Sequence, residues 1–184
     1  MIARYPVRRP SHDPDAPRPH EDQPMPEIAI RTATIDDVGT LMRLVRALAA
    51  YENLADKVVS SEADLRRDGF GPRPAFESRI ASLDGRDVGF TLFYPNYSTF
   101  AGRRGLFLED LFVDPEARGH GIGRRLLEDL AGIATARGWQ AIVLHVLDWN
   151  PTRRFYERLG FEQHGQWLLQ SLGGLALRRL ADRS

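Results

Sequence analysis

The chain contains no cysteine, which excludes disulfide bonds, thiolate metal sites and cysteine nucleophiles. Its 25 basic and 25 acidic residues cancel, whereas a nucleic-acid-binding protein usually carries a basic excess, so we expect no nucleic-acid partner. No apolar run is long enough to cross a bilayer, and the five histidines lack the paired spacing of a metal site. These absences predict a protein with no membrane span and no metal.

The composition of the chain changes near residue 26. Residues 1–26 are rich in Pro, Arg, Asp and His and nearly empty of large apolar side chains, so they cannot bury enough surface to offset the entropy of ordering. We predict a disordered N-terminal extension over 1–26 and one domain over 27–184, for which a chain that is 42% hydrophobic is sufficient. No hydrophobic segment follows Arg8-Arg9 as an export signal requires, which favours a cytoplasmic location.

Hydrophobic periodicity and turn residues predict a mixed α/β fold without internal repeats. Apolar segments rich in strand-forming residues predict strands over 28–31, 75–83, 88–94, 105–113, 141–147 and 167–171. Asp84-Gly85 predicts a hairpin turn between the second and third of these strands. Helical spacing predicts one helix capped by Asp36, one preceded by Ser61, one ending near residue 137, one over 151–160 and one over 175–180.

The most informative segment is a strand, a glycine loop and a helix in direct succession. The strand over 105–113 carries the acidic pair Glu109-Asp110, which a simple core strand would not contain. The loop reads Arg-Gly-His-Gly-Ile-Gly over 118–123. Glycines let backbone N–H groups approach a ligand, and a helix N-terminus adds unpaired donors and a positive dipole. The segment indicates a phosphate-binding loop, and turn geometry alone is the alternative. A P-loop is excluded, because Gly-Lys-Ser/Thr does not occur.

The order Arg-x-x-Gly-x-Gly resembles the pyrophosphate loop of the GNAT superfamily of acyl-CoA-dependent N-acetyltransferases. Further segments resemble that superfamily in the same order along the chain: 31–37, 50–52, 68–71, 97–100, 146–150 and 155–161. The resemblance runs from residue 27 to the C-terminus and narrows to the diamine (spermidine/spermine) and thialysine acetyltransferases, on the thialysine-like side. It implies an α/β (α+β mixed) GNAT-like domain with a mixed, mostly antiparallel central sheet flanked by helices, acetyl-CoA as cosubstrate, and a homodimer.

The resemblance also implies which residues bind coenzyme A. The loop would hold the diphosphate through backbone N–H groups, with Arg124 adding charge, and the preceding strand would hold the pantetheine arm. The implied contacts are Leu111, Phe112, Val113, Arg118, Gly119, His120, Gly121, Ile122, Gly123, Arg124, Asn150 and Tyr156. For Asn150, a helix N-cap is the alternative interpretation.

Acetylating a primary amine near neutral pH requires that the amine first lose a proton. An alkylammonium has a pKa of about 10.4, so forming the free amine at pH 7 costs about 4 to 5 kcal/mol. A carboxylate beside the amine attracts the cation and accepts its proton. Glu109 is the candidate, and a solvated strand residue is the alternative. Because strand side chains alternate, Asp110 is expected to face the opposite side.

The departing thiolate benefits from a proton donor, a role that the resemblance gives to Tyr156, with a core aromatic as the alternative. Glu52 matches an acid that faces the cationic substrate in diamine acetyltransferases, with a helix-surface glutamate as the alternative. Ser98 stands where the polyamine branch has an aspartate, and losing an acid weakens the field for a long polycation. The expected site for a small lysine-like amino acid or diamine therefore consists of Glu52, Ser98, Glu109 and Asp110.

The leading interpretation is an acetyl-CoA-dependent N-acetyltransferase that works by direct attack in a ternary complex. A covalent intermediate is not expected, because the sequence contains no recognisable activated nucleophile. Two alternatives remain open. One is acetylation of a protein or antibiotic amine, and the other is a non-catalytic acyl-CoA-binding module.

Overall fold

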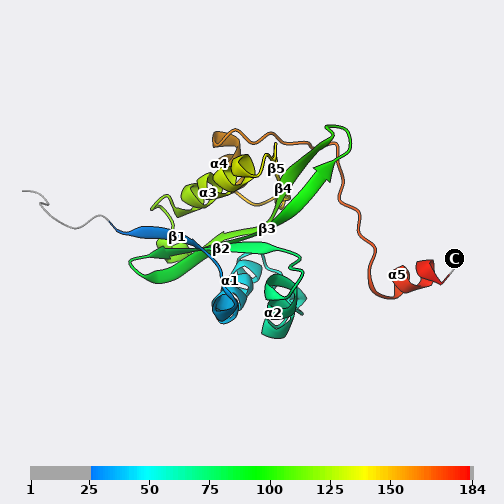
Figure 1. Cartoon of the computed structure of the whole chain (residues 1–184), viewed down its shortest axis with the longest axis horizontal. Helices are drawn as coiled ribbons and strands as arrows, with labels where there is room; N and C mark the ends of the chain where they lie inside the picture. Colours follow the sequence, from blue (N-terminus) through cyan, green and yellow to red (C-terminus); the bar gives the residue numbers. More distant parts are fainter. Residues whose placement is uncertain (1–25, 183–184) are drawn as a thin grey trace, which may run out of the picture. The chain divides into compact units, whose positions relative to one another are not determined.

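The computed structural model describes residues 26–182, drawn in colour in Figure 1. The predicted extension over 1–26 therefore lies, except for its last residue, outside the described residues. The described chain forms two compact units, one ending at Ile142 and the other beginning at Val143. Each unit is described by itself.

A five-stranded sheet in the order β1-β2-β3-β4-β5 organises the fold. The strands span Ile28–Thr32, Glu77–Leu83, Arg86–Ser98, Arg103–Val113 and Ile142–Leu144. Strands β1 to β4 pair antiparallel with their sequence neighbours. The predicted hairpin turn is confirmed, because Asp84 and Gly85 connect β2 to β3 with φ of 51° and 77°. Strand β5 is shorter than the predicted 141–147.

Helices cover both faces of the sheet in the first unit (Figure 1). Helices α1 (Val38–Tyr51) and α2 (Glu62–Phe70) lie on one face, and α3 (Ile122–Ala136) lies on the other. Side chains alternate along a strand, so consecutive residues pack into the hydrophobic cores on opposite faces of the sheet. Ile80 and Phe112 join the core beneath α1, whereas Ala81 and Val113 join the core beneath α3. The mostly antiparallel sheet flanked by helices is thus confirmed.

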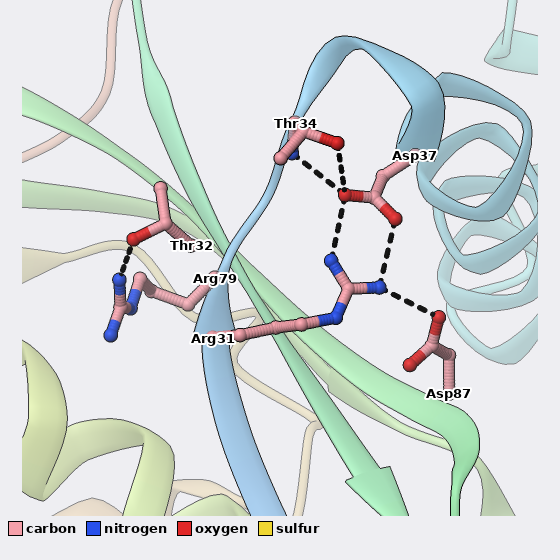
Figure 2. A network of polar contacts seen from close by, with 6 residues as sticks. All are labelled: Arg31, Thr32, Thr34, Asp37, Arg79 and Asp87. Carbon is pink, nitrogen blue, oxygen red and sulfur yellow. Dashed lines mark hydrogen bonds and ion pairs between the residues drawn. The ribbon is translucent and has the colours of Figure 1, made fainter.

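The start of α1 differs from the prediction, and Figure 2 shows the polar contacts that Asp37 makes there. Asp36 is not the cap, because a 3-10 turn over Ile35–Asp37 precedes the helix. Asp37 accepts hydrogen bonds from the N–H of Thr34 at 2.7 Å and from the Arg31 guanidinium at 2.7 and 2.8 Å, and Arg31 also reaches Asp87 at 3.0 Å. These donors lower the pKa of Asp37 to about 2, with Arg31 the largest cause. The network ties β1 to α1 and β3.

The second unit contains α4 (Arg153–Arg158) and α5 (Gly174–Ala181). The predicted helices over 151–160 and 175–180 are confirmed, the first with a turn in place of its first residues. The predicted strand over 167–171 is wrong, because none of the residues from 26 to 182 pairs with that segment as a strand. Apolar side chains alone predict a strand, but a strand also requires a neighbour for its N–H and C=O groups.

Candidate functional site

The acidic pair lies at a β-bulge in β4. Leu92 of β3 faces Asp110, and the next residue, Phe93, faces Leu108. Glu109 is therefore an extra residue in β4, opposed by no residue of its own. A bulge interrupts the alternation of side chains and can redirect one of them.

The bulge turns both acids to the same face of the sheet. Leu92 and Tyr94 are two residues apart in β3 and share a face. Leu92 faces Asp110, while the Tyr94 hydroxyl donates a hydrogen bond of 2.9 Å to Oε2 of Glu109. The expectation that Glu109 and Asp110 face opposite sides is therefore wrong, because it assumed an uninterrupted pleat.

A third acid, Glu52, interacts electrostatically with this acidic pair. Glu52 follows the last turn of α1, where its N–H donates to the carbonyl of Leu48 at 3.0 Å. Burial raises the pKa of Asp110 to about 7, and the negative charges of Glu109 and Glu52 add to the shift. Burial also raises the pKa of the half-buried Glu52. The three expected substrate-facing acids thus form one electrostatic cluster, hereafter the acid cluster (Glu52, Glu109 and Asp110).

Ser98 lies away from the acid cluster. It ends β3, six residues beyond Leu92, which is about 20 Å along the strand. Its exposed hydroxyl accepts a hydrogen bond from the N–H of Ala101 at 3.2 Å. The structure therefore gives Ser98 a role in the turn between β3 and β4.

The glycine loop has the geometry of an anion site. Gly119 and Gly121 have φ of 87° and 80°, which a side chain rarely adopts, and Gly121 is the N-cap of α3. Within the described part of the chain, no group accepts a hydrogen bond from the N–H of Gly119, Gly121 or Gly123. These donors therefore remain available for a ligand at the positive end of the α3 dipole.

The Arg118 side chain is engaged away from these glycines. Its Nε donates to the carbonyl of Val113 at 3.1 Å, and its guanidinium carbon lies 4.5 Å from the centroid of the Tyr51 ring. The guanidinium also lies 5.8 Å from the centroid of Phe112. Arg118 thus connects the end of α1, next to Glu52, with the end of β4.

The other expected cofactor contacts of the first unit have assigned partners as well. His120 Nδ1 lies 3.2 Å from the carbonyl oxygen of Ala117, and the exposed Arg124 donates to Glu128 at 2.7 Å. Leu111 packs against the core beneath α3. The side chains of His120 and Arg124 thus have partners within the protein, and the groups that the loop leaves for a ligand are backbone N–H groups.

Two expected residues lie in the second unit. The Asn150 side chain is buried, and its Oδ1 accepts from the N–H and the hydroxyl of Thr152 at 3.0 and 2.8 Å. The N-cap interpretation of Asn150 is wrong, because the N-cap of α4 is Thr152, and Asn150 instead orders the turn before that helix. The half-buried Tyr156 packs with ring centroids 5.3 Å from Phe155 and 5.4 Å from Phe161. The role of Tyr156 as the proton donor to the departing thiolate stays a prediction.

Tyr94 is the site residue that the sequence analysis missed. Burial and the hydrogen bond to Glu109 raise its pKa to about 12. Its ring stacks on Phe107, its partner in β4, with centroids 5.2 Å apart. No sequence signal marks Tyr94, because its approach to Glu109 depends on the bulge.

The described residues give no sign of a metal site or of a membrane-spanning helix. Between residues 26 and 182, no three or more His, Asp or Glu side chains are arranged to hold a metal ion. In the same range, no helix has the length and apolar character to span a membrane.

Comparison with known proteins adds independent information. Residues 44–161 match the model of the acetyltransferase (GNAT) family. Thialysine N-epsilon-acetyltransferase of Bos taurus is 39% identical over 168 residues, covering 85% of this chain and 98% of the relative. An L-ornithine N5-acetyltransferase of Arabidopsis thaliana is 27% identical over 197 residues, covering 82% and 86%. The solved structure of an integron cassette protein from the mobile metagenome of V. cholerae has a TM-score of 0.68 at 26% identity, covering 84% of this chain and 97% of its own.

Proposed function

This chain belongs to the acetyltransferase (GNAT) family, and on that premise we propose that it transfers the acetyl group of acetyl-CoA to a primary amine of a small cationic acceptor. The acceptor class is a thialysine- or lysine-like amino acid or a diamine. The observation that carries this proposal is the acid cluster, in which the bulge of β4 turns Glu109 and Asp110 to one face while Glu52 lies close enough to influence Asp110. Three carboxyl groups attract an ammonium group and disfavour an anionic acceptor.

The glycine loop fits the diphosphate of acetyl-CoA. The N–H groups of Gly119, Gly121 and Gly123 have no acceptor among the described residues, and the two left-handed glycines leave the backbone uncovered. Bound acetyl-CoA supplies an acetyl thioester. In our proposal, the N–H groups of Gly119, Gly121 and Gly123 hold the diphosphate, and the backbone of Leu111 and Val113 holds the adjoining arm.

The acid cluster would remove the proton that blocks the amine nitrogen. Glu109 accepts one proton from the bound ammonium, which frees the nitrogen lone pair to attack the acetyl carbonyl directly. As the C–N bond forms and the C–S bond breaks, Tyr156 donates its phenolic proton to the departing sulfur. The nitrogen then releases its second proton to water, and water returns a proton to Tyr156, so that each proton has a donor and an acceptor. No step requires a covalent bond between the acetyl group and the protein.

Two features support a small acceptor over a long polyamine. Ser98 holds a turn and adds no negative charge, so the acid cluster is not extended along β3. The bovine relative, 39% identical, is a thialysine acetyltransferase, and we carry that acceptor class to this chain as a proposal.

The decisive experiment measures thiol release from acetyl-CoA with thialysine, lysine, putrescine and spermidine side by side. We expect the highest kcat/KM with thialysine or lysine. Tight acetyl-CoA binding without turnover on any amine would contradict the proposal and favour a non-catalytic acyl-CoA-binding module. Turnover confined to protein or aminoglycoside amines would favour the other alternative.

Two variants test the assigned residues. Glu109→Gln and Tyr156→Phe should each lower kcat roughly a hundredfold, the range of general acid–base catalysis, and leave the Kd for acetyl-CoA unchanged. Glu62→Gln is the matched control, because Glu62 is an exposed glutamate in the first turn of α2. Wild-type rates in both test variants would remove both assignments.

We further propose a homodimer located in the cytoplasm. Large apolar side chains between residues 167 and 180 are at least half exposed: Trp167, Leu168, Leu169, Leu172, Leu175, Leu177 and Leu180. Such patches are uncommon on monomers and are typical of interfaces, which bury about 800 Å² on each partner. Light scattering should give twice the chain mass of 20.8 kDa, and a monomer at micromolar concentration would contradict this.

The absence of cysteine supports the proposed cytoplasmic location, because a chain without cysteine requires no oxidising compartment.

A further inference from the structure

Tyr94 contacts the acid cluster, but the proposed chemistry has not used it. We propose that Tyr94 is a positioning residue for acetyl transfer, whose hydroxyl holds the carboxylate of Glu109 in the orientation that accepts the proton of the acceptor amine. This inference rests on the proposed function of Glu109.

The bulge explains why Glu109 needs a positioning residue. As the extra residue of β4, Glu109 has no facing residue in β3 that would set its direction. Its side chain is exposed, and a glutamate side chain has several rotatable bonds and therefore many accessible rotamers. Among the described residues, only Tyr94 donates a hydrogen bond to this carboxylate. Without Tyr94, Glu109 would sample many orientations.

Tyr94 itself is held in place. It faces Phe107 in the β3–β4 ladder, and the two rings stack with centroids 5.2 Å apart and an interplanar angle of 22°. The ring therefore has a defined direction, and its hydroxyl reaches past Phe107 to Glu109 at 2.9 Å. A rigid aromatic on the neighbouring strand thus orients a flexible acid.

The hydrogen bond uses only one of the two carboxylate oxygens. Tyr94 donates to Oε2 of Glu109, while Oε1 receives no hydrogen bond from any residue between 26 and 182. Oε1 is therefore the atom that takes the proton: an N–H bond of the ammonium breaks, an O–H bond forms at Oε1, and the nitrogen keeps the electron pair. Tyr94 remains a donor throughout, because burial and Glu109 raise the pKa of its hydroxyl to about 12.

Tyr94→Phe tests this role, because it removes the hydroxyl and keeps the ring that stacks on Phe107. We expect kcat/KM for the amine to fall roughly five- to tenfold, as for a lost hydrogen bond to a charged group at a partly exposed site, with an unchanged Kd for acetyl-CoA. The loss should fall on kcat rather than on the KM for the amine, because the hydroxyl orients the proton acceptor and leaves the charge of the acid cluster unchanged. Tyr97→Phe is the matched control on the same strand, with an exposed ring.

A double-mutant cycle separates positioning from a merely structural effect. In a Glu109→Gln background no carboxylate remains to be oriented, so Tyr94→Phe should change kcat/KM by less than twofold. Two results would overturn the inference while leaving the proposed function intact. One is that the effects of the two substitutions on kcat/KM multiply in the double variant, and the other is that Tyr94→Phe alone keeps the wild-type kcat/KM. A wild-type protein that acetylates no amine would instead overturn the proposed function and this role with it.

Discussion

Replacing Gly121 with alanine tests the anion site directly. Gly121 has a φ of 80°, and alanine at that angle costs about 1 kcal/mol of stability. A Cβ atom built at Gly121 meets no atom within 4 Å, so the change introduces strain without an internal clash. For a chain of this size, about 1 kcal/mol corresponds to a decrease in Tm of roughly 2 to 4 °C.

The effect of Gly121→Ala on acetyl-CoA binding should be larger than its effect on stability. A methyl group at the N-cap of α3 stands where the diphosphate approaches the N–H groups of the loop. Losing one hydrogen bond to a charged group costs about 1.5 to 3 kcal/mol, so we expect the Kd to rise roughly ten- to a hundredfold. Isothermal titration with acetyl-CoA measures the affinity, and differential scanning fluorimetry measures the Tm.

Gly138→Ala is the matched control. Gly138 follows the opposite end of α3, has a φ of 68°, and has equally open space around an added Cβ. The 15 residues of α3 separate the two positions by about 22 Å. Gly138→Ala should lower the Tm by a similar amount and leave the Kd unchanged. Equal weakening by both variants, or a wild-type Kd in Gly121→Ala, would refute the assignment of the loop.

Three further predictions concern the stability of the fold. The pKa of Asp110 is raised from 3.8 to about 7, so the folded state keeps a proton that the unfolded chain releases, and folding stability falls as the pH rises from about 4 to 7. Asp110→Asn should therefore raise the Tm at pH 8 but not at pH 4. An equal change in Tm at the two pH values would contradict this prediction. The pKa of Asp37 is lowered from 3.8 to about 2, so its contribution to folding stability is present above about pH 4 and lost toward pH 2. The shift corresponds to at most about 2.4 kcal/mol, and solvent screening of the exposed Arg31 reduces this to about 1 kcal/mol. Asp37→Asn should therefore lower the Tm at pH 7 and have little effect at pH 2. The hydroxyl of Thr91 is fully buried and bonds to none of the described residues, so Thr91→Val should raise the free energy of unfolding by about 1 kcal/mol in urea denaturation, and a decrease would contradict the reasoning.

The local elements of this protein could be predicted from the sequence. The turn at Asp84-Gly85 and the Ser61–Asp64 capping box before α2 involve residues one to three positions apart. The glycine loop before α3 was predicted for the same reason, because left-handed glycines and free N–H groups are properties of a short segment. The family resemblance depends on such segments, and residues 44–161 match the family model.

The tertiary structure decided how the acids are arranged. Residue alternation predicted Glu109 and Asp110 on opposite faces, whereas the bulge turns both to one face and brings Tyr94 to Glu109. The predicted strand over 167–171 did not form, although its composition favours one. A turn or a helix cap is determined by neighbours along the chain. Strand register, bulges and pairing depend on hydrogen bonds to residues far away in the sequence, which no local pattern contains.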